Sequence, residues 1–438
     1  MKQFIFLFFF AFITVQSQEY TVTGVFMDSL HKVENIALYK IENGEPRYLK
    51  FTKVKKDTFR ISMKTLTKGY YRALYKNVKT GYVDFIYNKE NVLFEVDSRV
   101  GQSSVGFLAS RENQLLGAYQ YNMNTLQRKL DSIQFSFFNH PNGDVVLYKE
   151  VKSKVDGAQK YYEDLAQNDY CLGEIKASKR YNAPLPFTLP GEYLESLVHH
   201  YFDFVDFKDE RLRNASFLKN KISEYVFYLH QSQDVGQQNK LLLNAMNTVL
   251  SLTEDASLKE EILRFLMQTV VEKENYEVLV KTMEIYKGLP KEIQKQMFIN
   301  ETNRFAKVML GVIAPNITIS GQETLYDLNA TDQYLVIFWS STCSHCLQEL
   351  PQVKKILTTK SNITVVAVGI EDKEDQKKWQ EMSRKFPNWK HTIAIGKWES
   401  KAADDYNVSA TPSYFLLNKD KRIISKPQSL GALKQLMK

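Results

Sequence analysis

Two cysteines separated by two residues, Cys343 and Cys346, are the residues of this sequence whose type and spacing most clearly indicate chemistry. The chain has three cysteines in all, and random placement would give this spacing roughly one or two times in a hundred. Two thiols this close can form a disulfide and exchange it with other thiols, with a thiolate as the attacking species. The chemistry that the pair indicates is therefore thiol-disulfide exchange.

The residues around the pair predict how it is positioned. The apolar run 334–339 is typical of a strand buried on both faces of a sheet, and residues 347–353 predict a helix that begins at or near Cys343. The unpaired N–H groups and the positive dipole end of a helix start favour a thiolate there. Cys346 follows one helical turn later, and we expect it to be more buried. We therefore expect Cys343 to attack the substrate and Cys346 to resolve the mixed disulfide.

Later segments continue the alternation of strands and helices. We expect strands at 363–370, 391–395 and 408–417, and a helix at 371–386. Thr411 and Pro412 stand before the apolar part of the last strand, where a cis bond would leave backbone groups free to pair with a bound peptide. A trans proline at an edge strand is the alternative, and the dithiol favours the cis form. Thr411 and Pro412 are our candidate substrate-binding residues.

Residues 310–438 resemble the exported thioredoxin-like reductases related to cytochrome c maturation proteins. The motifs that carry this resemblance are Gly311–Pro315, Leu325–Leu328, Phe338–Ser340, Cys343–Cys346, Glu349–Pro351 and Ala410–Pro412. The resemblance implies an α/β thioredoxin-like fold with a four- or five-stranded sheet, protein thiol or disulfide substrates and a membrane electron donor. It requires no cofactor or metal beyond the redox-active Cys343–Cys346 disulfide.

One residue near the pair supports the resemblance, and two depart from the family pattern. Glu349 matches a family glutamate close to the buried thiol and would relay its proton, the alternative being an ordinary solvated helix residue. Thr342 replaces the tryptophan usual before the first cysteine. His345 would stabilise the Cys343 thiolate and raise the reduction potential, which leaves oxidase and isomerase roles open beside the reductase role that we favour.

The N-terminus predicts export. Lys2 precedes an apolar run at 4–15, and residues 1–17 read as a signal peptide cleaved after Ser17. The alternative is a retained anchor helix, but the run is shorter than the ~20 residues that span a bilayer. We expect a periplasmic or otherwise exported protein.

Two further domains are expected ahead of the redox module. Residues 18–105 alternate apolar and polar positions, as in Phe59, Ile61 and Met63, and predict a small all-β domain. Residues 110–309 predict an α-helical domain that begins with a helical hairpin. Its first helix carries a heptad seam, made of Leu116, Tyr119, Met123, Leu126, Leu130, Ile133 and Phe137. A coiled coil between chains, and so a homodimer, is the alternative use of this seam.

The remaining features of the sequence do not indicate a metal site or nucleic-acid binding. The segment 199–212 resembles a domain of unknown function found ahead of thioredoxin modules, and the adjacent His199 and His200 lack metal-site spacing. The net charge of +8 is scattered, so we expect no nucleic-acid binding. Cys171 reads as a small buried residue, with a resolving or intermolecular partner as the alternative. The competing hypothesis is a partner-binding module in which the dithiol has a minor redox role.

Overall fold

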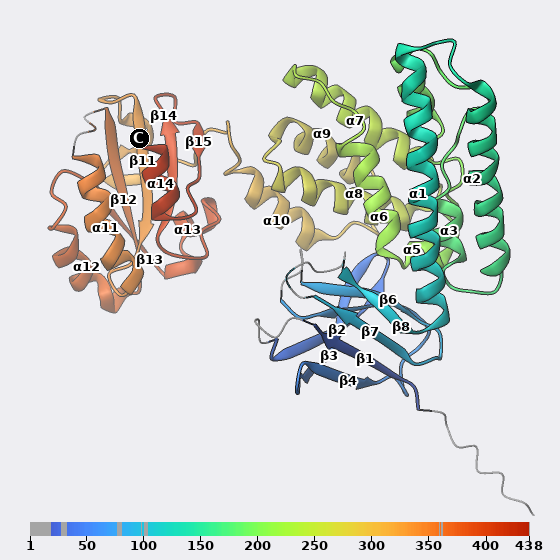
Figure 1. Ribbon diagram of the computed structural model, residues 1–438. Coiled ribbons are helices and arrows are strands. Elements are labelled where there is room, and N and C mark those ends of the chain that lie inside the picture. Colours follow the sequence, from blue (N-terminus) through green and yellow to red (C-terminus); the bar gives the residue numbers. More distant parts are fainter. Residues whose placement is uncertain are drawn as a thin grey trace, which may run out of the picture. The chain divides into compact units, whose positions relative to one another are not determined.

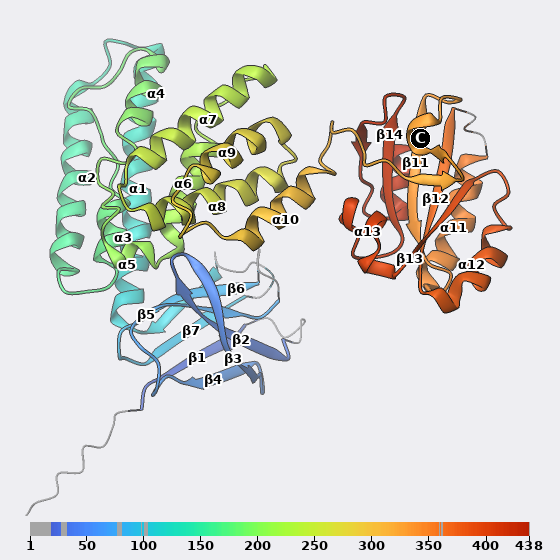
Figure 2. The same ribbon diagram turned by 180° about the vertical axis from the view of Figure 1, so that it is seen from behind.

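The computed structural model describes residues 19–27, 33–76, 81–97, 99, 104–358, 360 and 362–437 (Figures 1 and 2). The expected signal peptide at residues 1–17 lies outside the described residues. Contacts divide the chain into two compact units, residues 1–229 and residues 230–438. Within the described ranges, no helix is both long enough and apolar enough to cross a membrane.

The first unit begins with two four-stranded sheets that face each other. One sheet has the order β4-β1-β7-β8, from β4 (Thr58–Ser62), β1 (Thr21–Phe26), β7 (Val92–Val96) and β8 (Gly106–Ala109). The other has the order β3-β2-β5-β6, from β3 (Glu45–Lys53), β2 (Asn35–Glu42), β5 (Gly69–Leu74) and β6 (Tyr82–Tyr87). Alternate side chains of both sheets form one apolar core, including Phe59, Ile61 and Met63. The expected all-β domain is confirmed.

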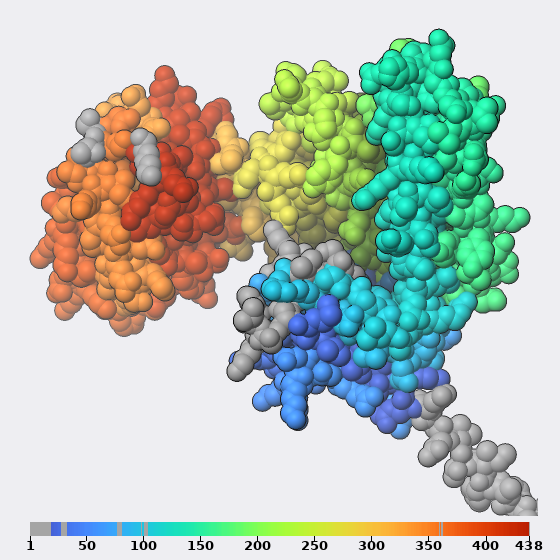
Figure 3. All heavy atoms as spheres, viewed as in Figure 1, coloured from blue at the N-terminus to red at the C-terminus, as the bar shows by residue number. Residues whose placement is uncertain are grey.

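Two long helices form the expected hairpin. Helix α1 (Arg111–Asn139) begins beside the strands and continues into the helical part, and α2 (Val145–Leu165) runs back along it (Figures 1 and 3). Ser110 and Asp144 cap the two helices through their side chains. The seam residues Leu130 and Phe137 are buried against α2 in the same chain. The seam is thus used inside the hairpin, which removes the sequence argument for a coiled coil between chains.

Shorter helices complete the first unit, namely α3 (Leu172–Ala177), α4 (Pro190–His199), α5 (Glu210–Arg213) and α6 (Ser216–Phe227). The outer face of the second sheet packs on helical residues, since Ile41, Tyr70 and Ile86 share a buried cluster with Tyr119 and Ile175. Cys171 lies in this cluster with no exposed surface. Burial and the nearby Glu112 carboxylate raise the pKa of its thiol to about 12, so it is a poor nucleophile.

The second unit begins with four helices, α7 (Val235–Ser251), α8 (Ala256–Glu272), α9 (Tyr276–Lys287) and α10 (Gln296–Ala306). Asp234, Asp255 and Asn275 cap the first three through side-chain oxygens. Each helix buries a single apolar face, as the period of the sequence predicts. The central part of the chain is therefore helical, as expected.

A five-stranded sheet in the order β13-β12-β11-β14-β15 organises the rest of this unit. Its strands are β13 (Lys390–Ile395), β12 (Ile363–Glu371), β11 (Gln333–Trp339), β14 (Ser413–Asn418) and β15 (Ile423–Ser425). The strands β11, β12 and β13 are parallel, whereas β14 and β15 are antiparallel to their neighbours. Two short strands precede the sheet, β9 (Thr318–Ser320) and β10 (Glu323–Thr324), followed by the 3-10 turn η2 (Leu325–Asp327).

Both faces of this sheet are covered, which explains the unbroken apolar run of β11. Leu335, Ile337 and Trp339 pack in one cluster with residues of α11 (Ser344–Leu357), α12 (Gln376–Ser383) and α14 (Leu430–Leu436). Tyr334, Val336 and Phe338 pack on the opposite face with α13 (Lys401–Asp405) and the segment around β9.

The predicted helix at 371–386 begins too early. Strand β12 continues through Glu371, the 3-10 turn η3 (Lys373–Asp375) follows, and α12 spans only Gln376–Ser383. The reason is that Glu371 is fully buried and still pairs with β13, opposite Ile395. A further 3-10 turn, η4 (Lys397–Glu399), leads into α13.

Candidate active site

Cys343 occupies the N-cap of α11, where β11 gives way to the helix. Its sulfur accepts a hydrogen bond from the backbone N–H of Cys346 at 3.3 Å, as a capping side chain does. The residue is partly exposed. Cys343 is thus both reachable from solvent and held at the positive end of a helix.

Cys346 lies one turn later on the inner side of the same helix. It has no exposed surface and packs with Trp339, Leu350 and Tyr414 in the core between α11 and the sheet. The two cysteines are not bonded in this structure, and their side chains interact with each other. The helix therefore presents one sulfur to solvent and holds the other directly behind it.

The surroundings push the acidities of the two thiols in opposite directions. Partial burial alone would raise the pKa of Cys343, but hydrogen bonds from the Cys346 thiol and from backbone N–H groups outweigh it and lower that pKa below its usual value. Burial, and then the neighbouring Cys343 sulfur, raise the pKa of Cys346 to about 12. Cys343 is consequently the thiol that ionises first.

Thr411 and Pro412 lie beside the dithiol. The Thr411–Pro412 peptide bond is cis, as the sequence predicts. The Cys343 thiol contacts the Thr411 carbonyl oxygen at 3.4 Å. Strand β14 begins directly afterwards, so this backbone lies next to the attacking sulfur.

Glu349 lies one helical turn beyond Cys346. Its carboxylate accepts a hydrogen bond of 2.8 Å from the hydroxyl of Tyr414, a residue of β14 that the sequence reasoning did not single out. Burial, and then the Glu349 carboxylate and both thiols, raise the pKa of Tyr414, which keeps its phenol protonated as a donor. Glu349 is therefore held in place by a buried hydroxyl that packs against Cys346.

Glu371 is a second residue that the sequence reasoning missed. Its fully buried carboxylate accepts hydrogen bonds from the Ser341 backbone N–H and, at 3.1 Å, from the Ser340 hydroxyl. The Ser340 oxygen in turn accepts from the Thr342 backbone N–H. These bonds fix the short loop that connects β11 to Cys343.

The side chains of the other candidate residues lie outside the group of residues described above around the two thiols. The His345 side chain is exposed on the first turn of α11, and its backbone N–H helps to lower the pKa of Cys343. His200 pairs with Asp203 at 2.6 Å and stacks on Tyr181, in the first unit. Throughout the described ranges, no group of three His, Cys, Asp or Glu side chains is arranged to hold a metal ion.

A central sheet flanked by helices, a dithiol at a helix start and a cis-proline beside it define the C-terminal part of the chain as a thioredoxin-like domain. Residues 332–423 match the family model described as thioredoxin-like. The thiol-disulfide oxidoreductase ResA of Bacillus cereus is 27% identical over 128 residues, which cover 27% of this chain and 70% of ResA. This domain is therefore thioredoxin-like and is similar to a thiol-disulfide oxidoreductase.

Solved structures with similarity to the chain include two from Bacteroides species. A thioredoxin-like protein from Bacteroides caccae is 20% identical, covers 59% of this chain and 97% of its own, and has a TM-score of 0.41. The thioredoxin domain of a thiol-disulfide oxidoreductase from Bacteroides vulgatus is 21% identical, covers 29% of this chain and 94% of its own, and has a TM-score of 0.26.

Proposed function

We propose that the chain is an exported enzyme that reduces disulfide bonds in protein substrates. The observation that carries the proposal is the asymmetry of the two thiols, with Cys343 reachable and its pKa lowered and Cys346 buried behind it. The N-terminal run at residues 1–17 supports export. The resemblance of residues 310–438 to exported reductases supports reduction, and not oxidation, of the substrate.

The reaction proceeds in two exchanges. The Cys343 thiolate attacks one sulfur of the substrate disulfide, forming a mixed disulfide and releasing the other substrate sulfur as a thiolate. The Cys346 sulfur, after losing its proton, attacks Cys343 and releases the second substrate thiol. The substrate gains two electrons and the enzyme retains the Cys343–Cys346 disulfide, so no separate cofactor is needed.

Three neighbouring residues serve these steps. The backbone at Thr411 and Pro412 lies beside the attacking sulfur and is suited to align an extended substrate segment. Glu349, held by Tyr414, accepts the proton of Cys346, which a pKa of about 12 otherwise keeps on the sulfur. A membrane electron donor would then reduce the enzyme disulfide.

The test is insulin reduction by the full chain and by two variants. We expect Cys343→Ala to abolish turnover, and Cys346→Ala to accumulate a mixed disulfide that non-reducing electrophoresis detects. Equal background rates in the wild type and the Cys343→Ala variant would favour the binding-module hypothesis instead.

A redox titration against glutathione determines the direction of the reaction. A reduction potential of the Cys343/Cys346 couple below about −250 mV supports the reductase, whereas a value near about −120 mV would indicate an oxidase. His345→Ala removes the imidazole and keeps the backbone N–H that acts on Cys343, and we expect it to lower the potential relative to the wild type.

A further inference from the structure

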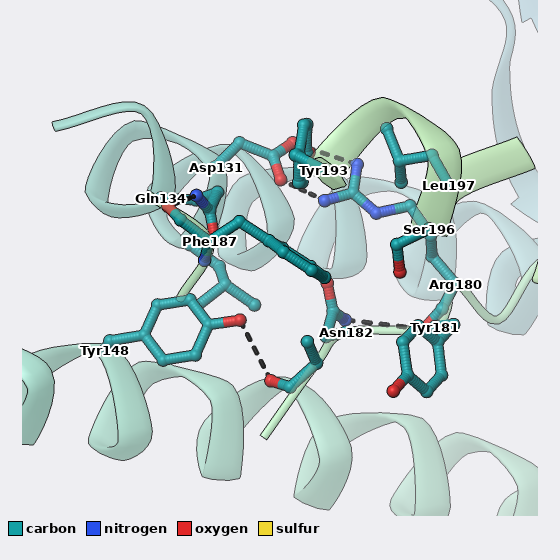
Figure 4. A pocket seen from close by; sticks show the side chains of 12 residues that line it. Asp131, Gln134, Tyr148, Arg180, Tyr181, Asn182, Phe187, Tyr193, Ser196 and Leu197 are labelled. Atoms are coloured by element: carbon teal, nitrogen blue, oxygen red, sulfur yellow. Dashed lines mark hydrogen bonds and ion pairs between the residues drawn. The ribbon is translucent and has the colours of Figure 1, made fainter. Parts of the chain in front are cut away.

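Two of the pockets in the described part of the first unit are lined in part by helix α1, and one of these two is closed by its own side chains. It lies between the hairpin and the segment 180–197 (Figure 4). Arg180 pairs with Asp131 across it, and the Tyr148 hydroxyl donates to the Ala183 carbonyl at 3.0 Å. Its volume of about 10 Å³ holds a single water molecule at most.

The other pocket is larger and opens to solvent. It has a volume of about 350 Å³ and lies between the outer face of the β3-β2-β5-β6 sheet and helices α1, α3 and α6. Its floor is buried and apolar around Ile41 and Ile86, and Phe107 and Phe217 stand at its partly exposed walls. This size and lining suit a small organic group.

Glu174 places a poorly compensated carboxylate in this pocket, whose lining is part polar and part apolar. The residue is 8% exposed, and among the described residues Gln120 is its one hydrogen-bond donor, at 3.3 Å. Burial, and then the charge of Asp84, raise the pKa of Glu174 to about 7. An ionised carboxylate with a single neutral donor is an unfavourable arrangement for folding alone.

The second acid of the pocket is already neutralised. Arg72 binds both carboxylate oxygens of Asp84, at 2.6 and 2.8 Å, and Ser216 donates to the same group at 3.1 Å. The described lining contains no lysine, arginine or histidine. When Glu174 is ionised, its negative charge therefore has no cation among the described lining residues to balance it.

Tyr70 provides an independent sign that a ligand is missing. Its ring lines the pocket and is 5% exposed, and its hydroxyl has no hydrogen-bond partner in the described part of the chain. Among the charged groups that act on it, Glu174 has the largest effect. A buried hydroxyl without a partner costs about 1–3 kcal/mol, which a polar ligand group would recover.

Gly117 leaves the mouth of the pocket open. It lies within α1 and lines the pocket, and a Cβ atom added there would meet nothing within 4 Å. Glycine inside a helix costs about 1 kcal/mol relative to alanine, and no packing contact requires it at this position. A larger side chain would occupy the space that a ligand needs.

We propose that this pocket binds a primary ammonium group carried on an apolar stem, with Glu174 as its counter-ion. The ammonium group would also give the Tyr70 oxygen a donor, and the stem would lie on the aromatic walls. A lysine side chain and a free alkylamine share this chemistry. The site is in the first unit and uses no residue of the dithiol domain.

Isothermal titration calorimetry of the full chain with n-hexylammonium chloride tests the proposal. We expect saturable binding at pH 8 that weakens at least about tenfold in Glu174→Gln and in Gly117→Leu. The matched control is Gly157→Leu, because Gly157 lies within α2 and also faces open space, and it should bind like the wild type. Because the cation requires the ionised carboxylate, affinity should also fall as the pH drops below about 7.

Two further ligands test whether the charge is required and which kind of amine binds. Hexan-1-ol has a similar shape without the charge, and equally tight binding of it would overturn the proposal. So would unchanged affinity in Glu174→Gln, or the absence of saturable heat at millimolar n-hexylammonium. Tighter binding of Nα-acetyl-lysine methylamide than of n-hexylammonium would assign a protein lysine as the ligand, and the reverse order would assign a free amine.

Discussion

Replacing Glu349, the proposed proton acceptor of Cys346, should slow the second exchange step and leave the first step unchanged. Glu349→Gln keeps the size of the side chain and an oxygen that accepts the hydrogen bond from Tyr414, but it cannot accept a proton. The change should therefore leave the fold and the attack by Cys343 intact. Its effect should fall on the resolution step, in which Cys346 must act as a thiolate.

The size of the effect follows from the acidity of Cys346. A pKa of about 12 means that only about one thiol in 100,000 is ionised at pH 7, a cost of about 7 kcal/mol. A positioned general base typically contributes 10²- to 10⁴-fold. We expect the resolution rate of Glu349→Gln at pH 7 to fall about a hundredfold.

The assay follows the release of thionitrobenzoate after a preformed mixed disulfide on Cys343 is resolved by Cys346 in a stopped-flow instrument. The rate of the variant should rise about tenfold per pH unit, because hydroxide must now remove the proton. Glu381→Gln, an exposed glutamate on α12, is the control and should behave like the wild type. Wild-type resolution rates in Glu349→Gln between pH 6 and 9 would refute the assigned role.

Four further experiments test other parts of the structure. Tyr414→Phe removes a hydrogen bond to a charged acceptor, which is worth about 1.5–3 kcal/mol, and should slow resolution about tenfold while Tyr406→Phe does not. Alkylation of Cys343 by iodoacetamide should reach half its maximum at a pH below that of free cysteine, because hydrogen bonds lower its pKa; an unshifted midpoint would contradict this. Glu371→Ala leaves buried donors of the loop unpaired and should lower the free energy of unfolding by about 1–3 kcal/mol per donor, measured by urea denaturation. The raised pKa of Glu174 means that its burial costs nothing below pH 4 and up to about 3 kcal/mol above pH 8, so Glu174→Gln should raise the melting temperature more at pH 8 than at pH 5.

The parts of the site that local sequence spacing determines were predictable. Cys343, Cys346 and Glu349 share one helix, where residues three apart face the same side, so their relation follows from the helix alone. The helix start could be inferred because the apolar run of β11 ends just before it. The Thr411–Pro412 bond was predictable only by reference to the dithiol, since nothing in the dipeptide itself selects the cis form.

Tyr414 and Glu371 were missed because strand pairing, and not sequence proximity, brings them to the site. Tyr414 pairs with Ile337 across two antiparallel strands, and both side chains point toward Cys346 and the helix. Successive side chains of a strand point to opposite faces of the sheet. Applied to residues 413–418 with this pairing, the rule would have placed the Tyr414 ring under α11. Glu371 ends a strand parallel to β11, and the carboxyl ends of such strands meet at one edge. We predicted a helix that begins at this residue instead.

The difference between the two thiols arises from where the loop before the helix is anchored. Glu371 fixes the backbone of Ser341, which sets the point at which α11 begins and leaves Cys343 as the N-cap. A helix that began one residue later would turn Cys346 by about 100° relative to the sheet and remove its burial. Both pKa shifts depend on this single register, because capping lowers the pKa of Cys343 while burial raises that of Cys346. The buried Glu371 carboxylate thus influences the acidity of both thiols without contacting either sulfur, because it determines which cysteine is exposed to solvent.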